Sequence, residues 1–223
     1  MPSKFNKTKS GKSSKKDEEI LRQFTLESEP KFEWLQFKFT LAVSVTLIGI
    51  HLLGLILFGT DIFLTIPDEF VSLFAMNNYL ILVVGDYYRL LTAIFIHQNI
   101  IHLGGNLLFL LIFSIRLEEI AGWKKAFVVF IMSGLGGNIL TLLIFGATPI
   151  LWSLGASGAV NGIFSANLYK MRTRYNKGSL SALSFLIVFS SFTIAGPQSN
   201  FFAHLGGLIF GWVTMYLFEK YNK

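Results

Sequence analysis

The chain has 223 residues, of which 52% are hydrophobic and 14% are charged, and its mean hydropathy of +0.57 is high for a soluble domain of this size. An apolar composition with charges confined to the ends and short loops is typical of membrane-spanning helices and disfavours a cytosolic globular protein. The formal net charge of +6 does not indicate a nucleic-acid partner, because the basic residues lie in the tail and the loops. Disulfides are excluded, since there is no cysteine.

Residues 1–33 are polar and rich in lysine, which predicts a basic, disordered cytoplasmic tail before a single domain over residues 34–223. This polar run is too long to begin a cleaved signal peptide. We expect its lysines to help fix the membrane topology, and docking on anionic lipid is the alternative interpretation.

The first uncharged run, residues 39–60, has 22 residues and predicts one helix across a hydrocarbon core of about 30 Å. Residues 61–98 are too many for a simple turn and too apolar to lie free in water, so we expect a long first outer loop that is partly embedded in the outer leaflet. The second span is predicted over residues 100–115.

Two longer uncharged runs follow, residues 126–169 with 44 residues and residues 178–218 with 41. Each is too long for one span and suits two helices joined by a turn, the second turn at Gly196-Pro197. The predicted fold is therefore an all-α membrane protein, a bundle of six transmembrane helices in contact with the lipid bilayer.

The orientation follows from the basic residues, which stay on the cytoplasmic side of a membrane. With both termini inside, the tail lysines and almost all loop lysines and arginines lie in the cytoplasm, and only Arg89 lies outside. We therefore expect a multi-pass protein of the cell membrane, of a prokaryote rather than an organelle.

Polar side chains within the predicted spans are few, and each must be hydrogen-bonded or functional. The chief ones are His51, His102, Asn106, Asn138, Ser157, Asn161 and His204. The topology brings His102 and Asn106 to the outer turns of the second span, Ser157 to the outer start of the fourth and His204 to that of the sixth. His102 and Asn106 are four residues apart and share a helix face.

A serine and a histidine at one depth suggest a nucleophile and its general base. The Asn106 amide, an N–H of His102 and backbone N–H groups beside Ser157 could stabilise an oxyanion. No carboxylate is available to orient His204, so a dyad is expected. Small residues on the fourth and sixth spans predict that these two helices touch.

These residues resemble the motifs of the rhomboid family of intramembrane serine proteases. The resemblance runs from about residue 88 to residue 211 and comprises, in order, Tyr88-Arg89-Leu90-Leu91-Thr92, Phe95-Ile96-His97, His102-Leu103-Gly104-Gly105-Asn106, Leu117-Glu118 with Gly122 and Phe127, Gly155-Ala156-Ser157-Gly158, and Ala203-His204-Leu205-Gly206-Gly207. It implies a six-helix core and cleavage of the transmembrane segments of membrane proteins, with Ser157 as nucleophile and His204 as base. It also implies His102, Asn106 and the Ser157 backbone N–H as the oxyanion hole, and no cofactor.

One position departs from the family pattern. Many members have an aromatic residue four positions after the serine, packed on the histidine, and here that residue is Asn161. An amide there could hydrogen-bond the imidazole instead. We expect His97 to hydrogen-bond within the outer loop, and His51 to be a buried, hydrogen-bonded residue away from the other polar groups.

Three alternatives remain open at this stage. A zinc site built on His97, His102 and His204 lacks the carboxylate that zinc proteases usually add. A rhomboid-like protein that is catalytically weak or inactive, and binds membrane helices without cutting them, would not need both Ser157 and His204. A transporter would more naturally have internal repeats and charged or broken helices near the membrane midplane.

Overall fold

The structure is a computed structural model that describes residues 36–61, 63–148, 152–175 and 200–221. The N-terminal tail and the predicted fifth span lie outside the described residues. Five long helices make up most of the described chain: α2 (Lys38–Phe58), α5 (Ile100–Ala121), α6 (Trp123–Phe145), α7 (Ser157–Tyr175) and α9 (Phe201–Tyr221).

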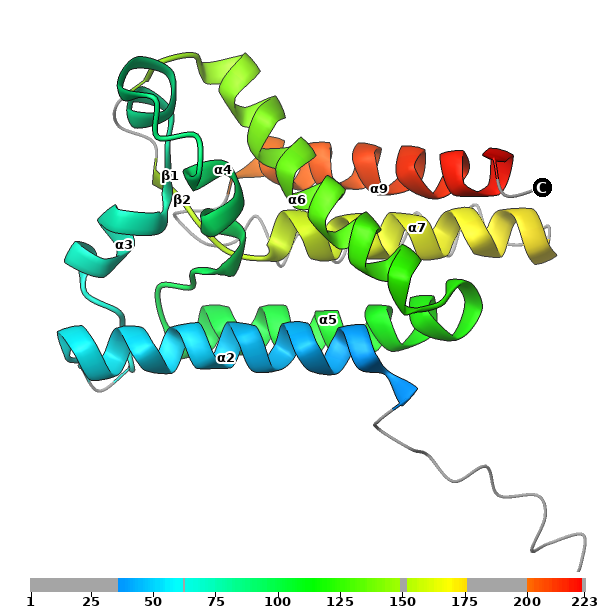
Figure 1. The fold of residues 1–223 in the computed structure, drawn as a ribbon, viewed down its shortest axis with the longest axis horizontal. Helices are drawn as coiled ribbons and strands as arrows, with labels where there is room; N and C mark the ends of the chain where they lie inside the picture. The colour runs from blue at the N-terminus through cyan, green and yellow to red at the C-terminus, as the bar shows by residue number, and fades with distance from the viewer. Residues whose placement is uncertain (1–35, 62, 149–151, 176–199, 222–223) are drawn as a thin grey trace, which may run out of the picture. The chain divides into compact units, whose positions relative to one another are not determined.

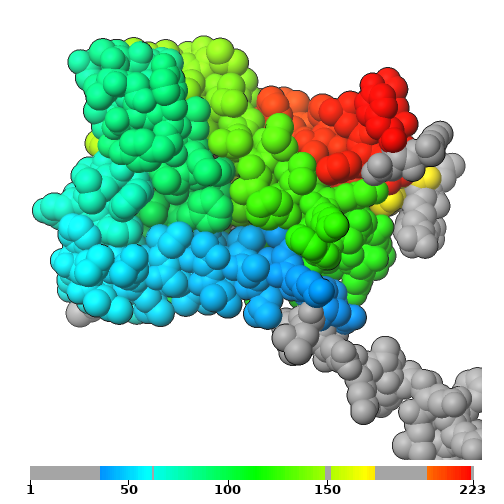
Figure 2. All heavy atoms as spheres, in the orientation of Figure 1, coloured from blue at the N-terminus to red at the C-terminus, as the bar shows by residue number. Residues whose placement is uncertain are grey.

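Helices α2, α5, α7 and α9 lie side by side, and α6 crosses them at a steep angle (Figure 1). The most extensive contacts are those that α6 and α7 make with α9 and with each other. Helix α7 also packs on α5, so it lies in the centre of the bundle. In the space-filling view of the same face, α7 is almost hidden behind the segments in front of it (Figure 2).

Four of the helices, α2, α5, α6 and α9, are long and apolar enough to cross a membrane, and they agree with the predicted first, second, third and sixth spans. These helices support a multi-pass membrane protein. The predicted fourth span corresponds to α7, which is less apolar because it carries asparagines and basic residues. Its central place suits Asn161 and Asn167, which are buried, since polar groups in lipid are tolerated where they face protein, whereas the basic residues lie at its C-terminal end.

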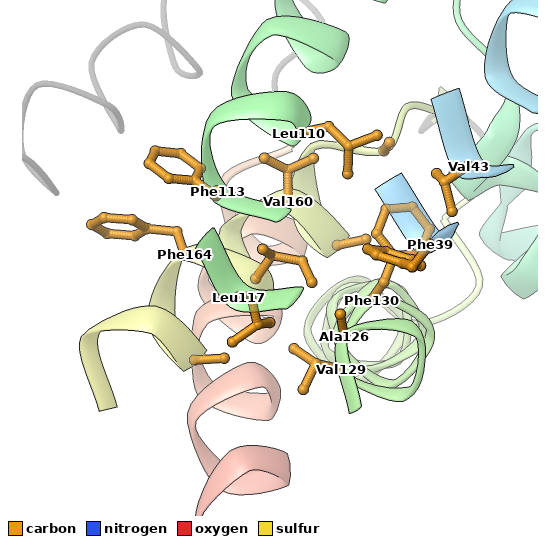
Figure 3. Packing of buried hydrophobic residues seen from close by; sticks show 14 of the residues in the cluster. Phe39, Val43, Leu110, Phe113, Leu117, Ala126, Val129, Phe130, Val160 and Phe164 are labelled. Carbon is orange, nitrogen blue, oxygen red and sulfur yellow. The ribbon is translucent and has the colours of Figure 1, made fainter. Parts of the chain in front are cut away.

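The main core lies between α2, α5, α6 and α7. Phe39 and Val43 of α2 pack against Phe130 of α6, and Leu110 of α5 lies near Val160 of α7 (Figure 3). The Phe39 and Phe130 rings meet edge to face, with centroids 5.7 Å apart.

A buried carboxylate joins the start of α2 to the last turn of α5. Glu118 accepts hydrogen bonds from the backbone N–H groups of Phe39, at 3.0 Å, and Thr40, at 2.7 Å, and from the Thr40 hydroxyl. The first N–H groups of a helix lack partners within it and favour a negative charge. Glu118 therefore acts as a cap supplied by another helix.

The segment between α2 and α5 is folded, as expected for a long loop. It contains α3 (Asp68–Phe74), β1 (Met76–Asn77), the π-turn η2 (Leu80–Val84), α4 (Arg89–Thr92) and the 3₁₀ turn η3 (Ala93–Phe95). Strand β1 pairs antiparallel with β2 (Trp152–Ser153), with Met76 opposite Ser153, an element that the all-α prediction did not include. Whether this segment enters the lipid stays a prediction.

Arg89 holds this loop together. Its guanidinium bonds to Asp86 at 2.9 Å and donates to the carbonyls of Ser72, at 2.7 Å, and Ala75, at 3.1 Å. The buried charge is thus paired and hydrogen-bonded, as a low-dielectric environment requires. Nearby, Asn138 of α6 donates to the Leu90 carbonyl at 2.8 Å and ties the loop to the bundle.

Candidate active site

Ser157 is the first residue of α7, two residues after a sharp turn at Gly155. Gly155 has a φ of +114°, which L-residues rarely adopt, and its N–H donates to the Ala93 carbonyl at 2.9 Å. A methyl group at position 155 would lie 2.8 Å from His102 Nε2. The chain can therefore enter α7 beside His102 only with glycine at this position.

His204 lies one turn into α9, and its side chain meets Ser157. The distance from Ser157 Oγ to His204 Nε2 is 2.8 Å, a hydrogen bond between residues that are 47 apart in sequence. His204 is almost completely buried, at 8% exposure. The remaining ring nitrogen, Nδ1, has no hydrogen-bond partner among the described residues.

Close backbone packing of α7 on α9 makes this approach possible. Gly207 of α9 lies against the Gly158 carbonyl, and Gly211 lies against Gly162, with no room for a Cβ atom at either α9 position. The predicted contact between the fourth and sixth spans is confirmed, and small residues permit it in the way expected for membrane helices.

His102 and Asn106 lie on the first two turns of α5, and both side chains lie near the turn at Gly155. Asn99 caps this helix by accepting the His102 N–H at 2.9 Å. A Cβ atom on Gly155 would lie 4.0 Å from Asn106 Nδ2, so both side chains flank the residue two before Ser157. One amide hydrogen of Asn106 bonds to the His102 carbonyl at 3.0 Å, which leaves the other for a ligand.

His97 bonds beyond the outer loop, which the sequence did not reveal, and the backbone of Phe95 within the loop also contacts its ring. Its Nε2 accepts the backbone N–H of Ala156 at 3.3 Å, directly before Ser157. Burial, with smaller effects from the neighbouring His102 and His51 rings, lowers the pKa of His97 to about 3. The ring is therefore neutral, as its role as an acceptor requires.

His51 is buried, as expected, but it does not lie away from the other polar groups. It is close enough to His97 to affect it electrostatically, and its ring lies beside backbone groups of His97 and Leu64. Hydropathy along one helix could not reveal that its neighbour would be a loop histidine.

Asn161 is buried on α7, one turn after Ser157. Its amide donates to the Ser157 carbonyl at 2.9 Å, and the described contacts of this amide do not include the His204 imidazole. Asn161 therefore stabilises the first turn of α7 rather than replacing the aromatic residue that usually packs on the histidine.

The histidines are engaged in other ways than metal binding. His97 Nε2 accepts from Ala156, and His204 Nε2 faces Ser157. Over the described ranges, no three histidine, aspartate or glutamate side chains lie close enough together to hold a metal ion.

Two polar side chains at the site were missed in the sequence. Asn200, directly before α9, donates to Ser153 Oγ on β2 at 3.1 Å. An asparagine before an apolar helix and after the Gly-Pro break is a recognisable helix start. Nothing local identifies Ser153 as its partner, because the contact joins segments 47 residues apart.

Comparison with known proteins agrees with this geometry. The model of the Rhomboid domain matches residues 84–221. Over 132 residues, the chain is 38% identical to "RHOMBOID-like protein 6, mitochondrial" of Arabidopsis thaliana, covering 57% of this chain and 42% of that protein. It is 34% identical over 143 residues to "Rhomboid-like protease 3" of Toxoplasma gondii, covering 60% and 52%.

A bacterial relative matches over a larger share of its own length. The chain is 29% identical over 141 residues to "Putative rhomboid protease YdcA" of Bacillus subtilis (strain 168), covering 60% of this chain and 68% of that protein. The chain spans about half or less of the Arabidopsis and Toxoplasma relatives. Because the family model covers more than half of the chain, and the paired serine and histidine lie within the matched region, the protein belongs to the rhomboid family.

Proposed function

We propose that this protein is an intramembrane serine endopeptidase that cleaves the transmembrane segments of other membrane proteins. The observation that carries the proposal is the 2.8 Å hydrogen bond between Ser157 Oγ and His204 Nε2, made across two helices in the interior of the bundle. A serine hydroxyl is a weak nucleophile until a neighbouring base accepts its proton.

In the proposed mechanism, Ser157 Oγ attacks the scissile carbonyl while His204 Nε2 takes its proton. The resulting imidazolium then gives that proton to the leaving amine. Water next attacks the acyl-enzyme while His204 takes its proton, and His204 returns that proton to Ser157 Oγ as the acid product leaves. This requires the neutral histidine to carry its hydrogen on Nδ1. No acidic side chain contacts His204 Nδ1 among the described residues, which supports a dyad rather than a triad.

The oxyanion would form beside Gly155, and we assign three donors to it. They are the free hydrogen of the Asn106 amide, a ring N–H of His102 and the backbone N–H of Ser157. The closeness of both α5 side chains to Gly155 supports this assignment. Such fixed donors stabilise the tetrahedral intermediate more than the substrate, because negative charge develops only during attack.

The substrates would be single-span or multi-span membrane proteins. A helical substrate must unwind locally to present its scissile bond, because helical hydrogen bonds occupy the backbone. No cofactor or metal is required by this mechanism. Rhomboid proteases act within the bilayer on membrane proteins, and the name of the Toxoplasma relative includes the word protease.

We propose a cell-membrane location with both termini in the cytoplasm and the site opening to the outer face. The Ser157 side chain lies at the start of α7, whereas basic side chains gather at the opposite ends of the helices. These are Arg116 on α5, Lys124 and Lys125 on α6, Lys170 and Arg172 on α7, and Lys220 on α9. Basic residues favour the cytoplasmic side.

The test is cleavage of a model single-span protein by the purified chain in liposomes. We expect Ser157→Ala and His204→Ala to abolish cleavage, and a metal chelator to have no effect. Asn106→Ala and His102→Ala should each lower kcat by about 10²- to 10³-fold, the usual effect of removing one oxyanion donor.

The matched control is Ser165→Ala. Ser165 is a buried serine two turns further along α7, and among the described residues its hydroxyl bonds to the Gly162 carbonyl alone, at 3.0 Å, so its loss should leave kcat unchanged. Binding of the substrate helix without cleavage by the native chain would favour the non-cutting rhomboid-like protein. Inhibition by the chelator would overturn the serine chemistry.

A further inference from the structure

We propose that Asn200 is a positioning residue for the reaction, which joins the strand leading to Ser157 to the helix that carries His204. This inference rests on the proposed function, because it concerns the separation of the proposed nucleophile and base. Asn200 touches neither reacting atom and would act only through the segments that it connects.

On the α9 side, Asn200 caps the helix that begins at the next residue. Its side-chain oxygen accepts the Ala203 N–H at 3.1 Å, and its backbone carbonyl accepts the His204 N–H at 3.2 Å. An asparagine cap of this kind satisfies N–H groups that have no partner inside the helix. The backbone of His204 is thus fixed directly by Asn200.

On the other side, the Asn200 amide nitrogen donates to Ser153 Oγ at 3.1 Å and to Thr141 Oγ1 at 3.0 Å. Ser153 is buried in β2 and paired with Met76 of β1, so it does not move independently of the outer loop. Thr141 is anchored in α6 by its bond to the Gly137 carbonyl at 3.0 Å. Three segments therefore meet at one amide.

The two connections to the reacting atoms are short and of equal length. Ser157 follows Ser153 by four residues, and His204 follows Asn200 by four. In the described part of the chain, the bond between Asn200 and Ser153 is the only hydrogen bond that joins residues 152–157 to residues 200–204, apart from the bond between Ser157 and His204 itself. Without it, the start of α9 could shift relative to β2.

The experiment compares Asn200→Ala, Asn200→Asp and the control Asn167→Ala in the full chain. Asn167 is a buried asparagine whose amide also makes two bonds, to the Phe113 and Ile163 carbonyls, and it lies about 15 Å along α7 from Ser157. For each variant we would measure kcat and KM in liposomes, the melting temperature, and the rate at which a fluorophosphonate labels Ser157.

We expect Asn200→Ala to lower both kcat and the labelling rate by about tenfold to 10²-fold, as misplacement by about 1 Å does, with KM changed by less than about twofold. Asn200→Asp should recover most of the rate, because a carboxylate accepts from the Ala203 N–H and from the Ser153 hydroxyl, which keeps both the cap and the connection. Asn167→Ala should lower the melting temperature but not the labelling rate below the transition.

Ser153→Ala removes the connection between the two segments and keeps the cap of α9, so it should slow labelling even if Asn200→Ala fails to fold. A native labelling rate in both variants would overturn the inference and leave the proposed function intact. So would failure of Asn200→Asp to recover more of the rate than Asn200→Ala. If the native chain itself is neither labelled at Ser157 nor able to cleave, the proposed function fails.

Discussion

Replacing Gly155 by alanine tests the turn that places Ser157 beside the proposed oxyanion donors. The added methyl group would lie 2.8 Å from both Cε1 and Nε2 of His102, a separation that real Cβ atoms essentially never show. The φ of +114° adds a backbone penalty, since a residue with a side chain is strained there. Both effects act on the residues that would bind the oxyanion.

The expected losses of stability and of turnover follow from the backbone strain and the contact with His102. Backbone strain of this type costs about 1–3 kcal/mol, which lowers the melting temperature of a chain of this size by several degrees. Relief of the contact requires His102 or the turn to move by several tenths of an ångström or more. Displacement by about 1 Å lowers turnover by about 10²-fold, so we expect Gly155→Ala to lose most of its kcat while still folding.

The assay is cleavage of a single-span substrate in liposomes, with the melting temperature measured in detergent. The control is Gly49→Ala on α2, where no atom lies within 4 Å of the added Cβ and φ is not positive. That variant should keep its kcat and be slightly more stable, because alanine favours helix. Native turnover in Gly155→Ala, or an equal loss in Gly49→Ala, would refute the reasoning.

Three further outcomes are expected. In Glu118→Gln, an amide NH₂ group replaces one carboxylate oxygen, and one of the N–H groups that Glu118 binds loses its acceptor. Thermal unfolding should show that the free energy of unfolding falls by about 1–3 kcal/mol, with kcat retained below the transition. Folding lowers the pKa of His97 from 6.5 to about 3, so between these pH values the unfolded chain binds more protons than the folded one. The free energy of unfolding should therefore decrease as the pH is lowered below 6.5, by up to about 1.4 kcal/mol per pH unit. His97→Gln should reduce this slope in acid titrations followed by melting, and an unchanged slope would assign it to other groups. Lys170 and Glu219 form a partly exposed ion pair, with 2.6 Å between Nζ and Oε1. A double-mutant cycle with Lys170→Met and Glu219→Gln should give a coupling free energy below about 1 kcal/mol, because solvent screens the charges. A larger coupling would contradict this screening.

Much of the architecture could be predicted from local composition. Uncharged runs predicted α2, α5, α6 and α9, because the thickness of the bilayer sets the length of a spanning helix, although α5 continues to Ala121, beyond the predicted end at residue 115. The spacing of His102 and Asn106 placed both on one face of α5, because residues four apart in a helix are neighbours. The order of the motifs indicated the rhomboid family, which the family model confirms.

The partners of individual polar groups could not be predicted in the same way. His97 bonds to Ala156 beyond its loop, Asn161 bonds to the Ser157 carbonyl, and His51 lies near His97. Each of these outcomes depends on which residues a neighbouring element presents. The sequence of a spanning helix says little about which face meets a neighbour, because lipid-facing and protein-facing surfaces are both apolar and hydropathy does not distinguish them.

The sequence by itself determined that the chain forms membrane helices with serine, histidine and asparagine at one depth, because helix length, charge placement and residue spacing are local properties. Only the tertiary structure decided that Ser157 Oγ and His204 Nε2 approach to 2.8 Å and that Asn200 joins their two segments. The physical reason is that these distances are set by the close packing of α7 on α9 through glycine, and by a partly buried amide shared among three segments. Such contacts exist only when residues far apart in the chain have been brought together.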